Sequence, residues 1–250
     1  FHYHNYDRTY REAGKIDTYK SESLVAKFES ERKISDNLSF GYGSDYKYDW
    51  GEYATLTFTS QTKGHVNNFG LYTNLGYIIS DHQLFSMHVR NDDHKQTGGN
   101  QTYKYSYIQK YDNAKIILTH STGLRNPSLY ELYGSSEYGY SANNLINPEK
   151  SETNEIFGQF NFSENLVFSS TAHRTRMKDR IKLNGSWSAY ENKILDTSQE
   201  GLENELSYKF SGQKISLMSN FSKSRTDTNG PNSRRPDLTY GLDYLGKLKS

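Results

Sequence analysis

The sequence predicts an all-β protein, a transmembrane antiparallel up-and-down β-barrel, and three observations lead to it. Apolar and polar residues alternate with a period of two in many segments, as they do in a strand with two unlike faces. Short and long polar connections alternate along the chain. A mean hydropathy of −0.92 accompanies an aromatic content of 14%. That combination disfavours a disordered chain and suits a barrel wall in which every second residue faces water.

The alternation predicts about twelve strands. Near residue 206, for example, Leu206 and Tyr208 point to one face and Glu205 to the other. The strands are expected near residues 1–10, 19–32, 38–49, 67–80, 83–94, 102–111, 115–122, 151–162, 166–183, 190–210, 214–225 and 237–248. Their apolar face is expected to form an outward band that includes Leu71, Leu75, Tyr105, Phe160, Leu206, Tyr208, Leu217 and Leu242.

The connections between these strands come in two sizes. Five short polar turns lie near residues 35–37, 80–83, 111–113, 163–165 and 211–213. Longer polar stretches cover roughly residues 11–18, 50–66, 95–101, 123–150, 184–189 and 226–236. Outer-membrane barrels have short periplasmic turns and long outside loops. The short turns are therefore expected on one rim, with Asn37 and Asn165 together, and the 123–150 loop on the other.

A soluble β-sandwich or barrel is the alternative use of the same strands, with the apolar face buried in a core. Its connections show no such alternation of length. Several strands here exceed ten residues, and their polar faces carry charge. Aromatic residues also gather toward strand ends, as an interfacial girdle requires; examples are Tyr46, Tyr48, Tyr103, Tyr190 and Phe210. These features favour the membrane barrel.

Composition excludes several functional classes. With 30 basic and 29 acidic residues, the chain has no basic stripe for nucleic acid, and without cysteine it has no disulfides or thiolate sites. No apolar run is long enough for a transmembrane helix, and no signal-peptide pattern opens the chain. No enzyme is expected, because no nucleophile elbow is present and the neighbours His120 and Ser121 point to opposite strand faces.

The histidine clusters have two interpretations, a metal or haem site and ordinary solvated side chains. His2 and His4 share a strand face, and His88 and His94 flank the pair Asp92 and Asp93. Neither cluster has the spacing of a zinc or EF-hand site. We therefore interpret these histidines as solvated lumen and loop residues, and expect neither metal nor cofactor.

The longest loop carries a recognisable motif. The stretch Ser121-Thr-Gly-Leu-Arg-Asn-Pro-Ser-Leu-Tyr-Glu-Leu-Tyr-Gly134 resembles the segment that leaves a mid-barrel strand in TonB-dependent outer-membrane receptors. Residues 144–155 resemble the family's Asn-Pro-x-Leu-x-Pro-Glu-x-Ser motif, without its first proline and with Asn147 before Pro148. Residues 197–206 resemble its Gly-hydrophobic-Glu strand, and Arg234-Arg235-Pro236 its late-barrel Arg-Pro element. The order and spacing of the four pieces make the joint resemblance specific over residues 83–248, whereas residues 1–82 fit by pattern alone.

The resemblance implies a larger protein around this chain. Family members carry an N-terminal plug domain with a TonB box and a barrel of 22 strands. Residues 1–250 would then form a partial barrel domain of about twelve consecutive strands, with the plug, the early strands and the final strands absent. A barrel that stops short has open edges in lipid, where unpaired backbone groups cost several kcal/mol each.

The function that the resemblance implies is TonB-dependent active transport of a scarce large ligand, of cobalamin or iron–siderophore type, across the Gram-negative outer membrane. The implied partners are outer-membrane lipid, the small-molecule ligand and the TonB-ExbB-ExbD system, which acts through the plug. The protein would be a multi-pass barrel of the cell outer membrane. The alternative, from a different class, is a passive porin or adhesion-type barrel without a plug.

The motif residues are expected to be mainly structural, because receptors for different ligands share them. They are Arg125, Pro127, Leu129, Tyr130, Glu131, Leu132, Asn147, Pro148, Glu149, Ser151, Gly201 and Glu203. Loop residues that resemble the family less are the better candidates for ligand contact, since tyrosine and tryptophan supply stacking area at low entropic cost. These are Trp50, Tyr53, Tyr138 and Tyr140.

Overall fold

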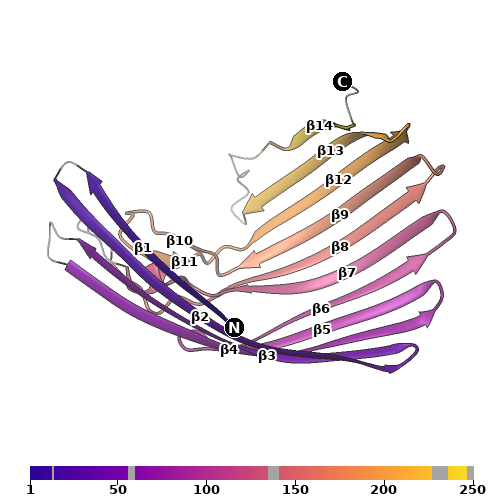
Figure 1. Cartoon of the computed structure of the whole chain (residues 1–250). Helices are drawn as coiled ribbons and strands as arrows, with labels where there is room; N and C mark the ends of the chain where they lie inside the picture. The colour runs from indigo at the N-terminus through magenta and orange to yellow at the C-terminus, as the bar shows by residue number, and fades with distance from the viewer. Residues whose placement is uncertain (13, 56–59, 135–140, 227–235, 247–250) are drawn as a thin grey trace.

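A computed structural model describes residues 1–12, 14–55, 60–134, 141–226 and 236–246. They form one curved antiparallel sheet of twelve strands, in which almost every strand pairs with its neighbour in sequence (Figure 1). The strands are β1 (His2–Glu12), β2 (Lys15–Ser35), β3 (Leu38–Thr55), β4 (Ser60–Ser80), β5 (Gln83–His94), β6 (Gly98–Lys110), β7 (Ala114–Arg125), β8 (Glu149–Asn161), β9 (Leu166–Lys178), β12 (Thr197–Phe210), β13 (Gln213–Thr226) and β14 (Leu238–Leu245). The sheet does not close, which makes it part of a barrel wall.

The five short turns all lie on one rim, as the alternation of connection lengths predicts. Each strand pair that they join is antiparallel, and the pairs follow one another along the sheet. Backbone hydrogen bonds of 2.8–2.9 Å link each turn to the next hairpin: Ile78 N–H to Asn37 O, Lys110 N–H to His82 O, Asn161 N–H to Asn113 O and Lys209 N–H to Asn165 O. The other connections, including the long segment between β7 and β8, lie on the opposite rim. Two of the predicted long stretches, 11–18 and 95–101, are wrong, because paired strands take up most of their residues: β1 ends at Glu12 and β2 begins at Lys15, and β6 begins at Gly98.

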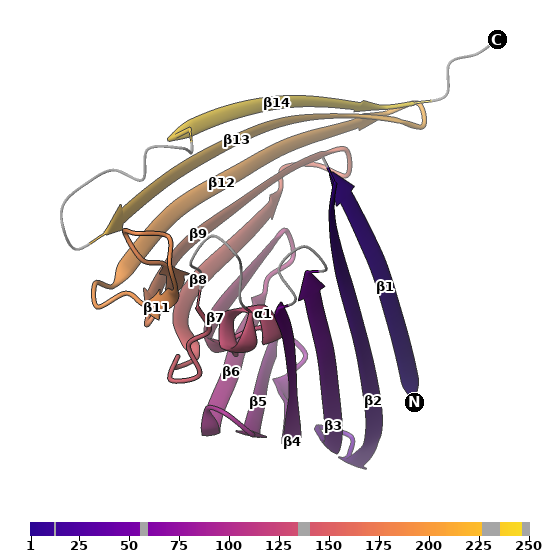
Figure 2. The ribbon, with the colours of Figure 1, turned by 90° about the vertical axis from the view of Figure 1, so that its left-hand side faces the viewer.

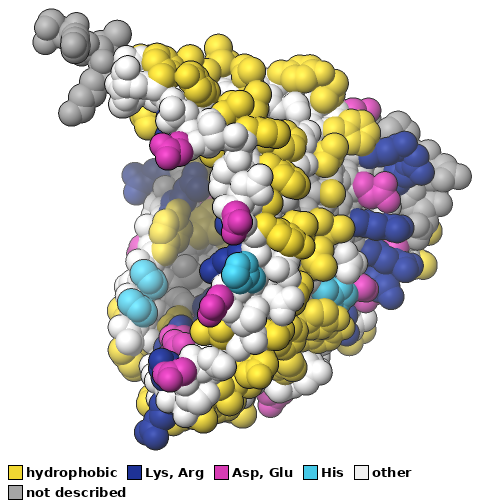
Figure 3. Space-filling model, turned by 90° about the vertical axis from the view of Figure 1, so that its right-hand side faces the viewer, with side chains coloured by type: hydrophobic (Ala, Val, Ile, Leu, Met, Phe, Trp, Pro, Cys, Tyr) yellow, Lys and Arg dark blue, Asp and Glu magenta, His cyan; other side chains and the backbone are white. Residues whose placement is uncertain are grey.

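The outer face of the sheet is apolar. Directly paired residues share a face, and the register from Leu75 through Met87 to Tyr105, and from Leu206 through Leu217 to Leu242, places the whole predicted band on one side. Most of these side chains are exposed. Figure 3 shows hydrophobic side chains spread over the surface outside the hollow of the molecule. The predicted outward band is confirmed.

The concave face is polar. Arg90 forms a bidentate ion pair with Asp45, with N–O distances of 2.6 and 2.9 Å, and a second pair with Asp92 at 2.7 Å. Glu205 accepts hydrogen bonds of 2.9 Å from Lys214 Nζ and Ser216 Oγ on this face, while Leu206 faces outward. Charges inside and apolar side chains outside are the reverse of a soluble β-protein.

The strands depart from the predicted limits at the long-loop rim. β3 and β4 continue through the expected loop 50–66 as far as Thr55 and from Ser60, because backbone pairing does not require apolar side chains. The predicted strand 166–183 ends at Lys178, followed by Asp179 at φ 54°, a conformation that interrupts a strand. The predicted strand 190–210 is likewise divided.

Between β9 and β12 a small separate hairpin forms, made of β10 (Ile181–Leu183) and β11 (Tyr190–Asn192). Tyr190 therefore belongs to this hairpin and not to the interfacial girdle in which it was expected. Tyr46, Tyr103 and Phe210 do lie on the outer face. Within the described residues no helix is long and apolar enough to cross a membrane.

Candidate functional site

The segment after β7 forms a short helix, α1 (Leu129–Tyr133), which begins with a capping box. Ser128 Oγ accepts a hydrogen bond of 3.3 Å from the Glu131 N–H, and the Glu131 carboxylate accepts one of 2.7 Å from the Ser128 N–H. Each side chain thus satisfies a backbone donor that a helix start leaves free. Pro127, just before the cap, is buried. The sequence Pro-Ser-Leu-Tyr-Glu therefore folds locally into a defined turn of helix.

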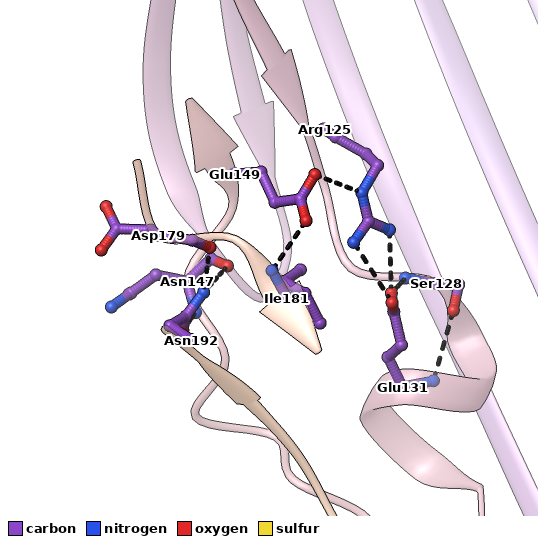
Figure 4. Close-up of polar contacts among 8 residues, drawn as sticks. All are labelled: Arg125, Ser128, Glu131, Asn147, Glu149, Asp179, Ile181 and Asn192. Atoms are coloured by element: carbon purple, nitrogen blue, oxygen red, sulfur yellow. Dashed lines mark hydrogen bonds and ion pairs between the residues drawn. The ribbon is translucent and has the colours of Figure 1, made fainter. Parts of the chain in front are cut away.

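Arg125, the last residue of β7, connects this helix to the next strand (Figure 4). Its two terminal nitrogens lie 3.1 and 3.2 Å from the Glu131 carboxylate, and its Nε donates to Glu149 Oε2 at 2.8 Å. Glu149 opens β8 and uses its other oxygen to accept the Ile181 N–H at 2.7 Å. The Arg125 guanidinium thereby joins α1 to the start of β8, and Glu149 extends the link to the β10–β11 hairpin. We call Arg125, Ser128, Glu131 and Glu149 the loop clamp.

Asn147 and Asn192 join the same two segments from the other side. The Asn147 N–H donates to Asn192 Oδ1 at 2.7 Å, and Asn192 Nδ2 donates to the carbonyls of Asn147 and Asp179 at 2.9 and 2.7 Å. Leu132, Ile146 and Ile181 of the same segments are buried, and Leu132 has no exposed surface. The loop is therefore a packed structure with its own small core.

Helix α1 lies on the concave face (Figure 2). Two glycines leave the space that it occupies there. Gly51 of β3 and Gly64 of β4 pair directly across the ladder. A β-carbon on Gly64 would overlap the Tyr133 ring, and one on Gly51 would lie 3.1 Å from Leu129 Cδ1. The missing side chains thus form a seat for α1 in the opposite part of the wall, and the loop extends over the hollow.

A cavity of about 250 Å³ lies between α1 and this wall. Its lining includes five tyrosines, namely Tyr6, Tyr19, Tyr53, Tyr130 and Tyr133. The ring centroids of Tyr19 and Tyr53 are 4.8 Å apart and the ring planes are tilted by 37°, an attractive arrangement for two aromatic rings. Burial raises the pKa of Tyr130 above its ordinary value, so its hydroxyl stays neutral at physiological pH. We call this space the tyrosine cavity; it offers flat apolar area and neutral hydrogen-bonding groups.

The structure brings some predicted site residues together and separates others. Arg125, Glu131 and Glu149 meet in the loop clamp, with Leu132 buried and Pro148 buried beside them. Ser151 faces Gly123 on the concave side, Gly201 lies against the His173 ring, and Glu203 lines a separate cavity of β12–β14. The motif therefore marks a clamp plus isolated wall positions.

The candidates for ligand contact also divide. Tyr53 lines the tyrosine cavity, whereas Trp50 follows the outward parity of Tyr46 and Tyr48 in β3. Tyr138 and Tyr140 lie outside the described residues, as do Arg234 and Arg235 of the Arg-Pro element. Tyr6, Tyr19, Gly51 and Gly64 had no motif to reveal them. A pair of glycines in register shows its meaning only once α1 is placed against it.

The histidine clusters fall on the concave face in part. His88, Asp92 and His94 share that face, whereas Asp93 points outward. His2 and His4 lie on the concave side of β1. Within the described part of the chain, no three His, Asp or Glu side chains come together in a group that could hold a metal ion.

Fold and site together define a wall segment of a receptor-type β-barrel, apolar outside and polar inside, with one long loop clamped over its concave face. The family model "TonB dependent receptor-like, beta-barrel" matches residues 1–249. The chain belongs to this family, whose members are outer-membrane β-barrels. The match includes residues 1–82, where the sequence alone offered only a pattern.

Known relatives extend the comparison. The vitamin B12 transporter BtuB of Photobacterium profundum is 26% identical over 151 residues, which are 60% of this chain and 24% of that protein. The copper transporter OprC superposes with a TM-score of 0.74 at 15% identity, covering 93% of this chain and 42% of that one. The siderophore receptor PirA from Acinetobacter baumannii gives 0.74 at 16% identity, covering 92% and 40%. The chain thus spans a quarter to two fifths of these proteins.

Proposed function

We propose that this chain is the wall of a TonB-dependent transporter that moves a scarce large ligand, of cobalamin or iron–siderophore type, across the Gram-negative outer membrane. The match of the family model to residues 1–249 carries the proposal. The chain covers 42% of the OprC chain. From the order of its motifs, residues 1–250 would be the middle and later wall of a 22-stranded barrel. The plug, the early strands and the final strands would belong to the rest of the protein.

The wall supports a membrane position. On β4 the outward residues Phe69 to Tyr77 form the apolar band. The eight steps between these two residues cover about 27 Å, and a tilt of about 40° reduces this to a height of about 21 Å. That height suits the apolar band of an outer-membrane barrel, which is about 25 Å tall. The long-loop rim, with the loop clamp, would then face the outside of the cell.

In this function the wall performs no chemical reaction. The polar concave face would surround the plug and the path of the ligand, and α1 with the tyrosine cavity would stand at its outer mouth. The motif residues of the loop clamp would hold that mouth in shape, while Tyr53 and its neighbours would contact the ligand. The partners would be the ligand, membrane lipid and, through the plug, the TonB-ExbB-ExbD system.

Dependence on TonB tests the proposal. The full-length receptor is expressed in a Gram-negative host that lacks its own receptors, with and without a functional TonB, and cells are given cobalamin, ferric siderophores or copper. We expect saturable uptake of one ligand in the TonB-containing strain and its loss in the other. Equal uptake in both strains would identify a passive porin and overturn the proposal.

A further inference from the structure

The turn between β5 and β6 supports the α1 segment at both of its ends. Residues 95–97 form this turn. Gln96 Nε2 donates a hydrogen bond to the hydroxyl of Tyr133, the last residue of α1. Thr97 Oγ1 donates one of 3.0 Å to Oδ1 of Asn126, which precedes the helix. The β5–β6 turn is therefore a third support of α1, beside the loop clamp and the two glycines.

These side-chain contacts position α1 because the backbone ladder ends below them. The pairing of β6 with β7 stops at Lys104 and Ser121, although both strands continue toward the long-loop rim. Beyond that level the Tyr103 N–H donates to Thr122 Oγ1 at 2.9 Å, in place of a backbone acceptor. The tip of the β5–β6 hairpin is thus joined to the segment after β7 by side chains, and the conformation of the turn decides where they lie.

His94, the last residue of β5, holds the turn in this conformation. Its Nδ1 accepts hydrogen bonds of 3.3 Å from the N–H groups of Gln96 and Thr97, and Thr97 Oγ1 lies 3.2 Å from the same nitrogen. A backbone N–H can only donate. Nδ1 therefore carries no proton, and His94 is the neutral tautomer with its hydrogen on Nε2. A proton on Nδ1 would face both N–H groups and break both bonds.

The position of His94 favours the neutral ring. The residue is 4% exposed. Its cross-strand partners, Asn68 of β4 and Gly98 of β6, carry no charge. Asn68 precedes Phe69, where the apolar band of β4 begins, so His94 lies just beyond the membrane-spanning part of the wall. Burial lowers the pKa of His94 below its ordinary value of 6.5.

The charged groups near His94 do not cancel this effect. Those on the elements around it are His4 of β1, Lys47 and Asp49 of β3, and Asp92 and Asp93 of β5. Asp49 pairs with Lys47 at 2.8 Å, and Asp92 pairs with Arg90 at 2.7 Å, whereas Asp93 points to the outer face. Because Asp49 and Asp92 already hold a cation each, they stabilise a further one on His94 only weakly.

We propose that neutral His94 positions α1 through the β5–β6 turn, and that protonation of His94 releases α1 and opens the tyrosine cavity. A group whose pKa is lowered while α1 is seated favours the seated form above the ordinary pKa of the group. That advantage is lost as the pH falls from 6.5 toward the lower pKa of the seated form. α1 is therefore seated at neutral pH and freed in mildly acidic surroundings.

The loop clamp does not share this response. Burial acts to raise the pKa of Glu149, but the hydrogen bonds from Arg125 and from the Ile181 N–H outweigh it and hold that pKa below its ordinary value. Glu149 therefore stays ionised in the pH range where His94 takes up a proton. The release of α1 is a property of the loop itself, and only its effect on uptake rests on the proposed function.

Hydrogen exchange of the purified full-length receptor tests the inference. The N–H groups of Leu132 and Gly134 are protected by the hydrogen bonds of α1, and so short a helix does not persist once it leaves the wall. Their exchange is measured by mass spectrometry at about pH 8 and at about pH 5, and each rate is divided by the intrinsic rate at that pH. We expect the corrected exchange to be about tenfold faster at the lower pH, since each pH unit below an ordinary histidine pKa favours the released form by up to tenfold.

Substitutions at His94 separate its protonation from its shape. His94→Asn places an amide oxygen near the position of Nδ1, where it can accept the same bonds and takes up no proton, so slow exchange is expected at both pH values. His94→Leu has no acceptor, so fast exchange is expected at both. The matched control His88→Asn removes the other concave histidine of β5, which lies deeper in the wall, and should leave the tenfold change intact.

Several outcomes would overturn the proposal: a pH response that persists in His94→Asn, slow exchange in His94→Leu, loss of the response in His88→Asn, or no response in the unmodified receptor. If His94→Asn does not fold, as judged by heat-modifiable migration on gels, Thr97→Val replaces it. This variant breaks the contact with Asn126 and keeps His94, so it should exchange fast at both pH values, and slow exchange would contradict the proposal.

Uptake is measured separately in the strains with and without TonB. Loss of TonB dependence with an intact exchange response would contradict the proposed function alone. Loss of the exchange response with intact TonB dependence would contradict the role of His94 alone.

Discussion

Leu206 and Glu205 show at the scale of single residues how the wall is arranged. Leu206 lies between Phe168 and Leu217 on the outer face, and Glu205 is held by Lys214 and Ser216 on the concave one. An arginine on a lipid face costs about 2–4 kcal/mol near the bilayer midplane. We expect Leu206→Arg to lower the free energy of unfolding of the full-length receptor by that amount, measured by urea titration of heat-modifiable migration on gels.

The adjacent substitution Glu205→Gln is the control for this prediction. It keeps the side-chain shape and removes one charge from a site that faces water, where an ion pair contributes about 0–1 kcal/mol. Stability should therefore change little. Equal losses in the two variants would contradict the alternation of lipid and lumen faces, because the residues are neighbours on one strand.

At this scale the sequence predicted some contacts and missed others. Arg125, Glu131 and Glu149 stand out in a motif, and the spacing from Ser128 to Glu131 is that of a capping box. Gly51 and Gly64 give no such signal, since their role depends on a helix that arrives from a loop 65 residues beyond Gly64. Trp50 could not be separated from Tyr53 without knowing how far β3 continues.

Among the elements, α1 offers a direct test of how the loop is seated. An ideal β-carbon on Gly51 lies 4.0 Å from Leu129 Cβ, within the 3.5–4.5 Å range of disulfides. The chain contains no cysteine that could compete. We expect Gly51→Cys/Leu129→Cys in the full-length receptor to form a disulfide in air, seen as a mobility shift that dithiothreitol reverses.

Ligand uptake by this oxidised variant reports whether α1 moves during transport. If α1 must leave its seat, uptake falls under oxidation and returns with reductant. The control Trp50→Cys/Leu129→Cys places its first cysteine on the outer face, one residue from Gly51, and should form no disulfide. Efficient crosslinking in the control, or none in Gly51→Cys/Leu129→Cys, would contradict the seat described for α1.

The sequence predicted which segments form strands, because the alternation of apolar and polar residues is a local property. It did not predict where the strands end. β3 and β4 continue past their outward apolar band, where backbone pairing and the contacts of Gly51 and Gly64 with α1 hold them. The residues of the β10–β11 hairpin continue the alternation of the neighbouring strands. The sequence therefore assigned them to the predicted strands 166–183 and 190–210. Asp179, with its positive φ, marks the break. Aspartate tolerates this conformation better than most residues, but a single aspartate does not mark a strand end in the sequence.

The whole sheet has two edges, β1 and β14, that carry no partner among the described strands. Unpaired backbone groups cost several kcal/mol each in hydrocarbon. We therefore expect residues 1–250 expressed alone to associate or aggregate in detergent and to show no heat-modifiable monomer on gels. The full-length receptor, run beside it, should show one. A folded monomer of the isolated wall would contradict the assignment to a larger barrel.

The hydrogen bonds that join one short turn to the next make the two rims differ in how much change of loop length they tolerate. Strand register is fixed at the turn rim, where each hairpin is tied to its predecessor. β9 and β12 keep full register although eighteen residues, including a hairpin, separate them at the other rim. A lineage of such proteins can therefore lengthen, shorten or exchange its outer loops without disturbing the wall. Cargo preference can diverge while the scaffold that assembles in the membrane stays the same.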